Sequence, residues 1–408
     1  MNYSVRLTGI FSVCVLLVVS TAASAQDWSQ WRGTNRDGKL SGFVAPQTWP
    51  KELTQKWKVT VGAGDSSPAL EGRRLYAFGR QDANEVISCL DAVSGEILWR
   101  DTYPAQFVVT GASARHPGPR SSPVASDGKV CVLGVGGILS CLDAATGKVL
   151  WRKQSTADFL DTAYQFESSM SPIVVDGMCI AYIGGKGKGS IIAFDLASGE
   201  AKWKYSGDAP APSSPVIMTI NSDRQIVTIS EKQVIGVSLA DRTLQWQVPF
   251  AARPVNTTTP VVDGQTVIVT GQGMGTLAIK VAKQNGKFTA EPIWTIKTGS
   301  SFTTPVLREG MLFGYAVGRF NCLSVQSGQE LWVDTTSRGQ SAAIVDAGSC
   351  LIALTINGEL LIYQPSDKQY IELARYKVAE SETWAHPVVA GKSIFIRDKD
   401  SVILWAIE

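Results

Sequence analysis

The side chains best suited to chemistry lie just ahead of a repeated Ser/Thr-Pro signal in this 408-residue chain. Both histidines of the sequence, His116 and His386, are among them. The other members of this candidate binding set are Asp65, Arg115, Arg120, Tyr164, Glu167, Arg253, Asn256, Arg338, Gln340 and Trp384. Guanidinium groups are rigid paired donors for carboxylates and phosphates, so the four arginines predict a surface that accepts anions. Taken singly, each residue is also explained as a solvated loop tip.

We assign no catalytic residue and no metal site. The two histidines belong to repeat units two apart, and a Ser-His-Asp triad has no nucleophile elbow to support it. The cysteines beyond residue 25 include no adjacent pair and no C-x-x-C pair, which excludes zinc-ribbon and thioredoxin-like sites. We expect six free, mostly buried thiols. Cys131 and Cys141 are the one plausible bridge, although direct cross-strand geometry strains a disulfide.

A repeated turn must position these segments. Leu90–Arg100 reads LDAVSGEILWR and returns, increasingly degraded, at 142–152, 194–204, 237–247 and 323–333. Asp91 can accept hydrogen bonds from the turn backbone, and Gly95 suits its left-handed position. A large ring at one structural address predicts packing between neighbouring modules. The predicted docking rings are Trp57, Trp99, Trp151, Trp203, Trp246, Trp294, Trp332 and Tyr376.

Each Ser/Thr-Pro signal is followed by a two-strand alternation and then by the Asp-turn-Trp unit. Four short strands every 38 to 55 residues are typical of a β-propeller blade. The sequence therefore predicts an all-β fold, an eight-bladed β-propeller of four-stranded antiparallel blades over residues 51–408. The eighth unit stops one strand short at its C-terminal end. We expect the orphan Trp57 strand to pair with Ser401–Ile407, which closes the ring and removes an open edge.

The first 50 residues stand outside this pattern. Residues 1–25 are predicted to be a signal peptide, with Arg6, an apolar run too short to span a bilayer, and a small-residue cleavage site. We expect an exported monomer, periplasmic or secreted, without a transmembrane segment. Residues 26–50 are a Trp-rich segment, predicted to form a strap on the main fold, with a carbohydrate-binding surface as the alternative. A net charge of +2 without basic blocks does not favour a nucleic-acid partner.

The D-x-x-[ST]-G-x-x-x-W unit after an [ST]-P strand resembles the tryptophan docking motif of the pyrroloquinoline-quinone (PQQ) repeat propellers. The resemblance covers nearly all of residues 51–408. It implies that the chain is one of two kinds of protein. The first is a quinoprotein dehydrogenase with PQQ and calcium in its central funnel, and the second is a BamB-type scaffold of outer-membrane protein assembly without a cofactor. The sequence lacks the adjacent cysteines, an assignable calcium-ligand motif and the long inter-blade insertions of the dehydrogenases. It also lacks the clear lipobox that BamB-type members usually carry.

These observations favour an exported, non-catalytic scaffold with no cofactor. Its partner is expected to be a protein, or alternatively a glycan, bound at the face that carries the long segments 100–120 and 152–170. The alternative is a PQQ-dependent oxidoreductase of the alcohol or sugar dehydrogenase type.

Overall fold

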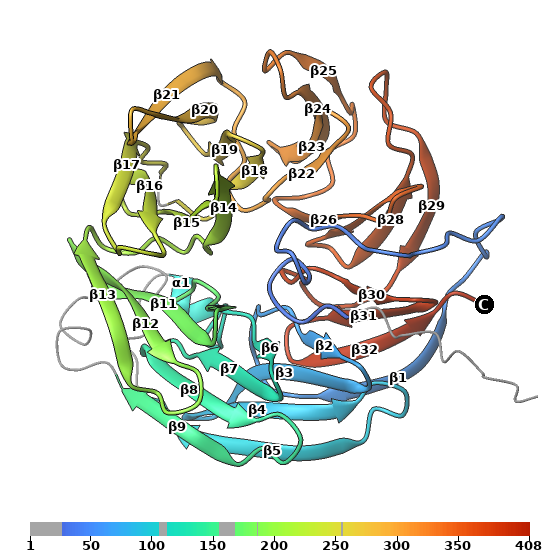
Figure 1. Ribbon diagram of the computed structural model, residues 1–408. Helices are drawn as coiled ribbons and strands as arrows, with labels where there is room; N and C mark the ends of the chain where they lie inside the picture. The colour runs from blue at the N-terminus through green and yellow to red at the C-terminus, as the bar shows by residue number, and fades with distance from the viewer. Residues whose placement is uncertain (1–26, 106–111, 155–167, 186, 254–255) are drawn as a thin grey trace, which may run out of the picture.

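The computed structural model describes residues 27–105, 112–154, 168–185, 187–253 and 256–408. These residues form eight four-stranded antiparallel sheets arranged in a ring, as Figure 1 shows. The predicted eight-bladed β-propeller is therefore confirmed. Within the same ranges, α1 (Ala112–Arg115) is the only helix, and it lacks the length and apolar character needed to cross a bilayer.

Seven blades are each built from four consecutive strands. Blade 1 contains β2 (Ala69–Glu71), β3 (Arg74–Gln81), β4 (Asn84–Asp91) and β5 (Ile97–Pro104), and blade 2 contains β6 (Val124–Ser126), β7 (Lys129–Leu133), β8 (Ile138–Asp143) and β9 (Val149–Gln154). Blade 3 contains β10 (Ile173–Val175), β11 (Met178–Gly185), β12 (Lys188–Asp195) and β13 (Ala201–Gly207), and blade 4 contains β14 (Val216–Ile220), β15 (Asp223–Ile229), β16 (Gln233–Ser238) and β17 (Leu244–Pro249). Blade 5 contains β18 (Val261–Asp263), β19 (Thr266–Gly271), β20 (Gly275–Gln284) and β21 (Lys287–Ile296). Blade 6 contains β22 (Val306–Arg308), β23 (Met311–Ala316), β24 (Arg319–Ser324) and β25 (Glu330–Val333). Blade 7 contains β26 (Ala342–Asp346), β27 (Leu351–Thr355), β28 (Glu359–Tyr363) and β29 (Glu372–Lys377).

Blade 8 is made from both ends of the chain. Its inner strands are β30 (Val388–Ala390), β31 (Ser393–Arg397) and β32 (Ser401–Ala406), and its outer strand is β1 (Thr54–Thr60). Trp57 lies opposite Leu404, and Thr60 lies opposite Ser401. The predicted closure by the Trp57 strand is confirmed.

The Asp turns have the geometry that their residue types require. Oδ1 of Asp91 accepts hydrogen bonds from the backbone N–H and the hydroxyl of Ser94, and Gly95 has a φ of +76°. Asp195 repeats the arrangement, and the donated N–H of Ser198 lowers the pKa of Asp195 to about 2. Each such turn therefore fixes the position of the strand that carries the next docking ring.

Most predicted docking rings reach the neighbouring blade. Five of the predicted indoles donate their N–H to a turn carbonyl there: Trp57 to Val93, Trp99 to Ala144, Trp151 to Leu196, Trp294 to Val325 and Trp332 to Ser366. Tyr376 donates instead to the carbonyl of Pro50, and Trp246 to Gln225 of its own blade. Trp203 is buried, and its N–H has no hydrogen-bond partner among the described residues.

The Ser/Thr-Pro signals join the inner strands into a belt of hydrogen bonds. The backbone N–H of the second residue in one blade donates to the matching hydroxyl of the next blade, at 2.8 to 3.0 Å. These bonds run from Ser67 to Ser122, Ser122 to Ser171, Ser171 to Ser214, Thr259 to Thr304 and His386 to Ser67. The repeated hydroxyls therefore satisfy backbone donors between blades, where sheet ladders cannot reach.

The six described cysteines are free and buried, as predicted. Cys131 and Cys141 lie directly opposite each other across β7 and β8. Hydrogen bonds with Cys141 and Cys179 raise the pKa of Cys131 well above its ordinary value.

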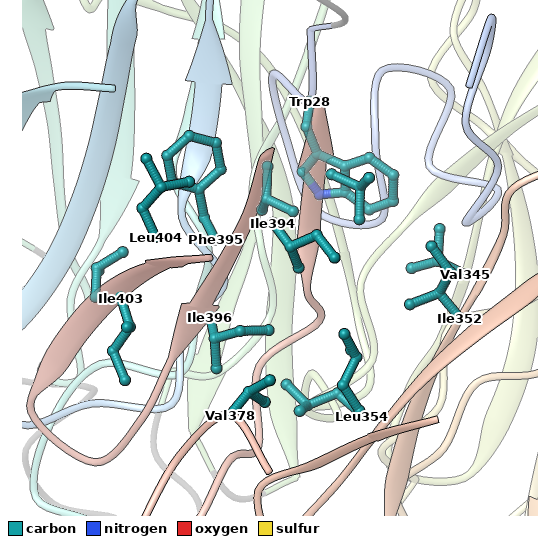
Figure 2. Packing of buried hydrophobic residues seen from close by; sticks show 14 of the residues in the cluster. Trp28, Val345, Ile352, Leu354, Val378, Ile394, Phe395, Ile396, Ile403 and Leu404 are labelled. Atoms are coloured by element: carbon teal, nitrogen blue, oxygen red, sulfur yellow. The ribbon is translucent and has the colours of Figure 1, made fainter. Parts of the chain in front are cut away.

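Residues 27–40 lie inside the ring, against its inner strands (Figure 1). Trp28 exchanges two backbone hydrogen bonds with Leu70 of blade 1, and Leu40 donates to the carbonyl of Asp346 of blade 7. The Trp28 side chain is 1% exposed and belongs to the same hydrophobic cluster as Ile394, as Figure 2 shows. Trp28 therefore offers no face to a sugar.

Candidate functional site

The connections between blades converge on one face of the ring, which we call the loop face. Asp65, His116 and Glu382 come from three such connections. Nδ1 of His116 lies 3.2 Å from Oδ2 of Asp65, and its Nε2 lies 4.0 Å from Oε2 of Glu382. The hydrogen bond with Asp65 raises the pKa of His116, against the opposing effects of burial and of Arg120. The imidazole thus links acidic groups from two separate connections.

Two aromatic rings extend this arrangement. The Trp384 indole donates to Oε2 of Glu382 and meets the His116 ring edge to face at 5.5 Å. Phe302, from the connection between blades 5 and 6, meets the Trp384 ring edge to face at 5.4 Å. We call Asp65, His116, Phe302, Glu382 and Trp384 the mouth cluster.

The structure places the predicted site residues in different surroundings. Asp65, His116 and Trp384 meet in the mouth cluster, and Arg120 donates to the carbonyl of His116 at 2.8 Å. Arg115, Arg253 and Gln340 are exposed. Tyr164 and Glu167 lie outside the described residues.

Two predicted site residues have structural contacts instead. Arg338 is buried in an ion pair with Asp334, and its guanidinium lies 4.7 Å from the Tyr370 ring centroid. Asn256 is also buried, where it accepts from the N–H of Ala252 and donates to the carbonyl of Phe250. The expected funnel of four free arginines is therefore not formed, because the guanidinium of Arg338 already has internal partners.

His386 lies inside the channel and faces the N-terminal segment. Its ring meets Trp31 edge to face at 4.7 Å, and Nη1 of Arg32 lies 3.5 Å from its Nε2. Burial first, and Arg32 second, lower the pKa of His386 well below its ordinary value. The two histidines of the protein are thus in opposite electrostatic environments.

A PQQ–calcium pair does not fit the residues present. Calcium needs several convergent oxygen ligands, but no three His, Cys, Asp or Glu side chains in the described ranges are placed to hold a metal ion. Arg32 and Trp31 occupy the interior of the ring, where Nη1 and Nη2 of Arg32 donate to backbone carbonyls of blade 6 and its buried Nε has no hydrogen-bond partner among the described residues. We therefore derive no reaction through a quinone cofactor.

The roles of Arg32, Arg36, Phe302 and Glu382 were not predictable from the sequence. Arg32 and Arg36 are fully buried with φ near +60°, next to or close to glycines in the W-R-G-x-N-R-D-G stretch. This concentration of glycines around two arginines was the only available signal. Nothing in the local sequence distinguishes Phe302 or Glu382 from other loop residues.

The ring defines this chain as a PQQ-like repeat β-propeller. Residues 83–334 match the family described as outer membrane protein assembly factor BamB. This chain belongs to that family.

Individual relatives agree with this assignment. BamB of Burkholderia pseudomallei (strain K96243) is 24% identical over 364 residues, covering 86% of this chain and 86% of that protein. The crystal structure of BamB from Moraxella catarrhalis superposes with a TM-score of 0.63 at 16% identity, covering 87% of this chain and 99% of that one. Quinohemoprotein alcohol dehydrogenase from Comamonas testosteroni gives a TM-score of 0.69 at 14% identity, covering 95% and 81%. At these identities the structural matches show the fold alone.

Proposed function

We propose that this protein is an exported, non-catalytic scaffold that binds a protein partner through its loop face. The mouth cluster carries the proposal: charged and aromatic side chains from separate connections meet there, above a channel that the chain itself occupies. Connections held on a rigid scaffold are favoured places for recognition. The relatives named as outer membrane assembly factors support a protein partner over a glycan.

A direct test compares capture of cell-envelope partners by two folded variants. Trp384→Ala with His116→Ala removes the centre of the mouth cluster, whereas Arg242→Gly changes an exposed arginine in a turn between β16 and β17. We expect the first variant to capture at least about tenfold less of the partner seen with wild type, as loss of a central aromatic contact implies. The second should capture as wild type does. Equal capture by both variants would remove the mouth cluster from the proposal.

The exposed arginines can be tested on the same bait. Arg115→Ala with Arg253→Ala should weaken capture most at low salt, because screening already weakens exposed charges at high salt. Arg338 is left intact, since its truncation would leave Asp334 buried and unpaired. Salt-independent capture would contradict a role for these charges.

Export is proposed from residues 1–25, which lie outside the described residues. The relatives' names place those proteins in outer membrane assembly, which supports a periplasmic location here. Protein recovered from the periplasmic fraction should begin at Gln26 by mass spectrometry. Recovery of a chain that still begins at Met1 from the cytosol would contradict the proposal.

A PQQ-dependent alcohol or sugar dehydrogenase is the second candidate, supported by the fold shared with the quinohemoprotein. Protein incubated with PQQ and calcium should show no retained quinone absorbance after gel filtration. A dye-linked assay on alcohols and aldoses should likewise show no turnover. Stoichiometric PQQ retention with turnover would replace the scaffold by this second candidate.

A further inference from the structure

Residues 27–40, which we call the plug, touch all eight blades of the ring. The contacts are hydrogen bonds of Trp28 with Leu70 (blade 1), Ser29 with Ala125 (blade 2), Arg36 with Ser171 and Pro172 (blade 3) and Pro215 (blade 4), Trp31 with Thr259 (blade 5), Arg32 with Thr304 and Pro305 (blade 6), Leu40 with Asp346 (blade 7), and the approach of Arg32 to His386 (blade 8). The ring therefore contacts this segment from every side.

Arg36 is the most completely bound side chain of the plug. Its Nε donates to the carbonyl of Pro215 at 2.7 Å, and its Nη atoms donate to the carbonyls of Pro172 and Ser171, each at 3.0 Å. No ion pair joins Arg36 to a carboxylate in the described ranges. Burial, with a smaller effect of Arg32, lowers the pKa of Arg36 to about 9. Blades 3 and 4 therefore recognise the guanidinium through backbone carbonyls.

Arg32 repeats this chemistry at blade 6. Nη1 donates to the carbonyl of Thr304 at 2.9 Å and Nη2 to that of Pro305 at 2.8 Å. Pro172, Pro215 and Pro305 all belong to the repeated Ser/Thr-Pro signal, so the repeat lines the channel with acceptors. Burying an uncompensated charge is costly unless its donors are satisfied. All three nitrogens of Arg36 meet that requirement, and so do both Nη atoms of Arg32, whose Nε has no partner among the described residues. A lysine ammonium could not reach these carbonyls together.

The connection between plug and ring is suited to exchange. Ser41, Gly42 and Val44 are exposed, and Val44 retains 85% of its accessible surface. Every contact of the plug with the ring is non-covalent, so an identical segment from another molecule would make the same contacts. These contacts can form whether the plug and the ring belong to one chain or to two.

We propose that the channel is a peptide-binding site for a tryptophan-containing segment with two arginines four residues apart. The plug is its resident ligand, and the same segment of a second copy of this chain can replace it. This site is separate from the loop-face partner site, and either can be wrong without the other.

The test uses the full chain with a protease site introduced between Gly42 and Val44. After cutting, the plug should remain with the ring during gel filtration, because none of its channel contacts is broken. A fluorescent peptide of residues 27–43 should then displace it, with a rise in anisotropy. Uncut protein should bind the peptide far more weakly, because the tethered plug has a high effective concentration.

Matched peptides test the recognition chemistry. Arg36→Gln removes the charge and most of the donors, and we expect roughly 100-fold weaker binding from the lost charged hydrogen bonds. Arg36→Lys retains the charge and should still bind at least about tenfold more weakly, since it cannot make the same paired contacts. The control peptide Lys39→Gln changes an exposed cation of the plug and should bind as the unaltered peptide does.

Four results would overturn the proposal. They are loss of the cut plug with no change in the melting temperature of the ring, unfolding of the ring on cutting, failure of the labelled peptide to exchange into cut protein, and equal binding of the Arg36→Gln and unaltered peptides.

Discussion

Inside the ring, Nη1 of Arg32 lies 3.5 Å from Nε2 of His386, so the imidazole faces a permanent cation. Nδ1 of His386 has no hydrogen-bond partner in the described part of the chain. A second positive charge at this position would be buried against the first. The pair therefore makes the neutral imidazole part of the folded structure.

This relationship predicts a loss of stability in mild acid. Because the folded pKa of His386 is lowered well below 6.5, the unfolded chain takes up a proton there before the folded chain does. Its contribution is complete above about pH 6.5 and is lost as pH falls toward the folded pKa, with a slope of at most about 1.4 kcal/mol per pH unit. Thermal melts from about pH 7 to about pH 5 should be less steep in pH for His386→Asn than for wild type. Parallel curves would contradict the prediction.

His116 should titrate in the opposite direction. Its hydrogen bond with Asp65 raises its pKa, so its stabilisation is present below about pH 6.5 and is lost as pH rises through the folded value. With only two histidines in the chain, NMR of labelled histidine gives two separable titration curves once any affinity tag is removed. Asp65→Asn should return the higher curve toward the ordinary value, whereas Asp127→Asn should leave it in place. A His116 curve that ignores Asp65→Asn would refute the assignment.

Glu85 gives a third pH-dependent prediction. It is fully buried between blades 1 and 2, where it accepts hydrogen bonds from the Tyr103 hydroxyl and the Val135 N–H, each at 2.7 Å. Burial raises its pKa against these two bonds, so its contribution is lost as pH rises from about 4.5 through the folded pKa. Glu85→Gln should therefore lose less stability than wild type as the pH is raised.

Glu85→Ala is the matched variant that removes the acceptor altogether. It should cost about 2–4 kcal/mol in urea unfolding at about pH 4.5, because the Val135 N–H is left buried without an acceptor, and the cost should fall as the pH is raised and the contribution of Glu85 is lost. A nearly neutral Glu85→Ala would show that this acid does not join the two blades.

Alanine substitutions at two glycines distinguish the cost of displacing a docking ring from the cost of backbone strain. Gly147 and Gly128 have φ values of +74° and +70°, so Ala at either position costs about 1 kcal/mol for its left-handed backbone. A Cβ at Gly147 would lie 2.6 Å from the Trp99 ring, whereas a Cβ at Gly128 would meet nothing within 4 Å. Gly147→Ala should therefore cost a further 1–3 kcal/mol or so in urea unfolding. Equal losses would mean that Trp99 moves aside without penalty.

Repetition made the fold predictable. In blade 2 the repeated unit 142–152 spans the end of β8 (Ile138–Asp143), the turn after it and most of β9 (Val149–Gln154), as its turn chemistry predicts. Local turn chemistry and strand alternation set these boundaries, and both are visible in a short stretch of sequence. Trp246 does not dock as the repeat predicts. In its copy of the repeat Arg242 replaces the turn glycine, and Gln225 of the same blade accepts the indole N–H.

The candidate site was harder to predict because its contacts are remote in sequence. Arg36 donates to carbonyls 135 to 179 residues away, and Arg32 donates to carbonyls 272 and 273 residues away. An arginine in a polar segment is ordinarily solvated, and apart from the glycines beside them nothing in the local sequence indicated that these two are buried. Arg338 was predicted to be free for binding, but it forms an ion pair with Asp334. That partner lies only four residues earlier in the sequence and was not recognised.

The split construction of blade 8 determines when the molecule can be finished. Thr60 and Ser401, 341 residues apart, meet in adjacent strands, so β1 is synthesised first and finds its partner last. Loop closure over such a separation is slow. A chain delivered amino end first is an open arc with an unpaired strand edge at each end until β32 arrives. Its period of exposure to chaperones, proteases and other copies is therefore set by delivery of the whole chain, not by the folding rate of any one blade.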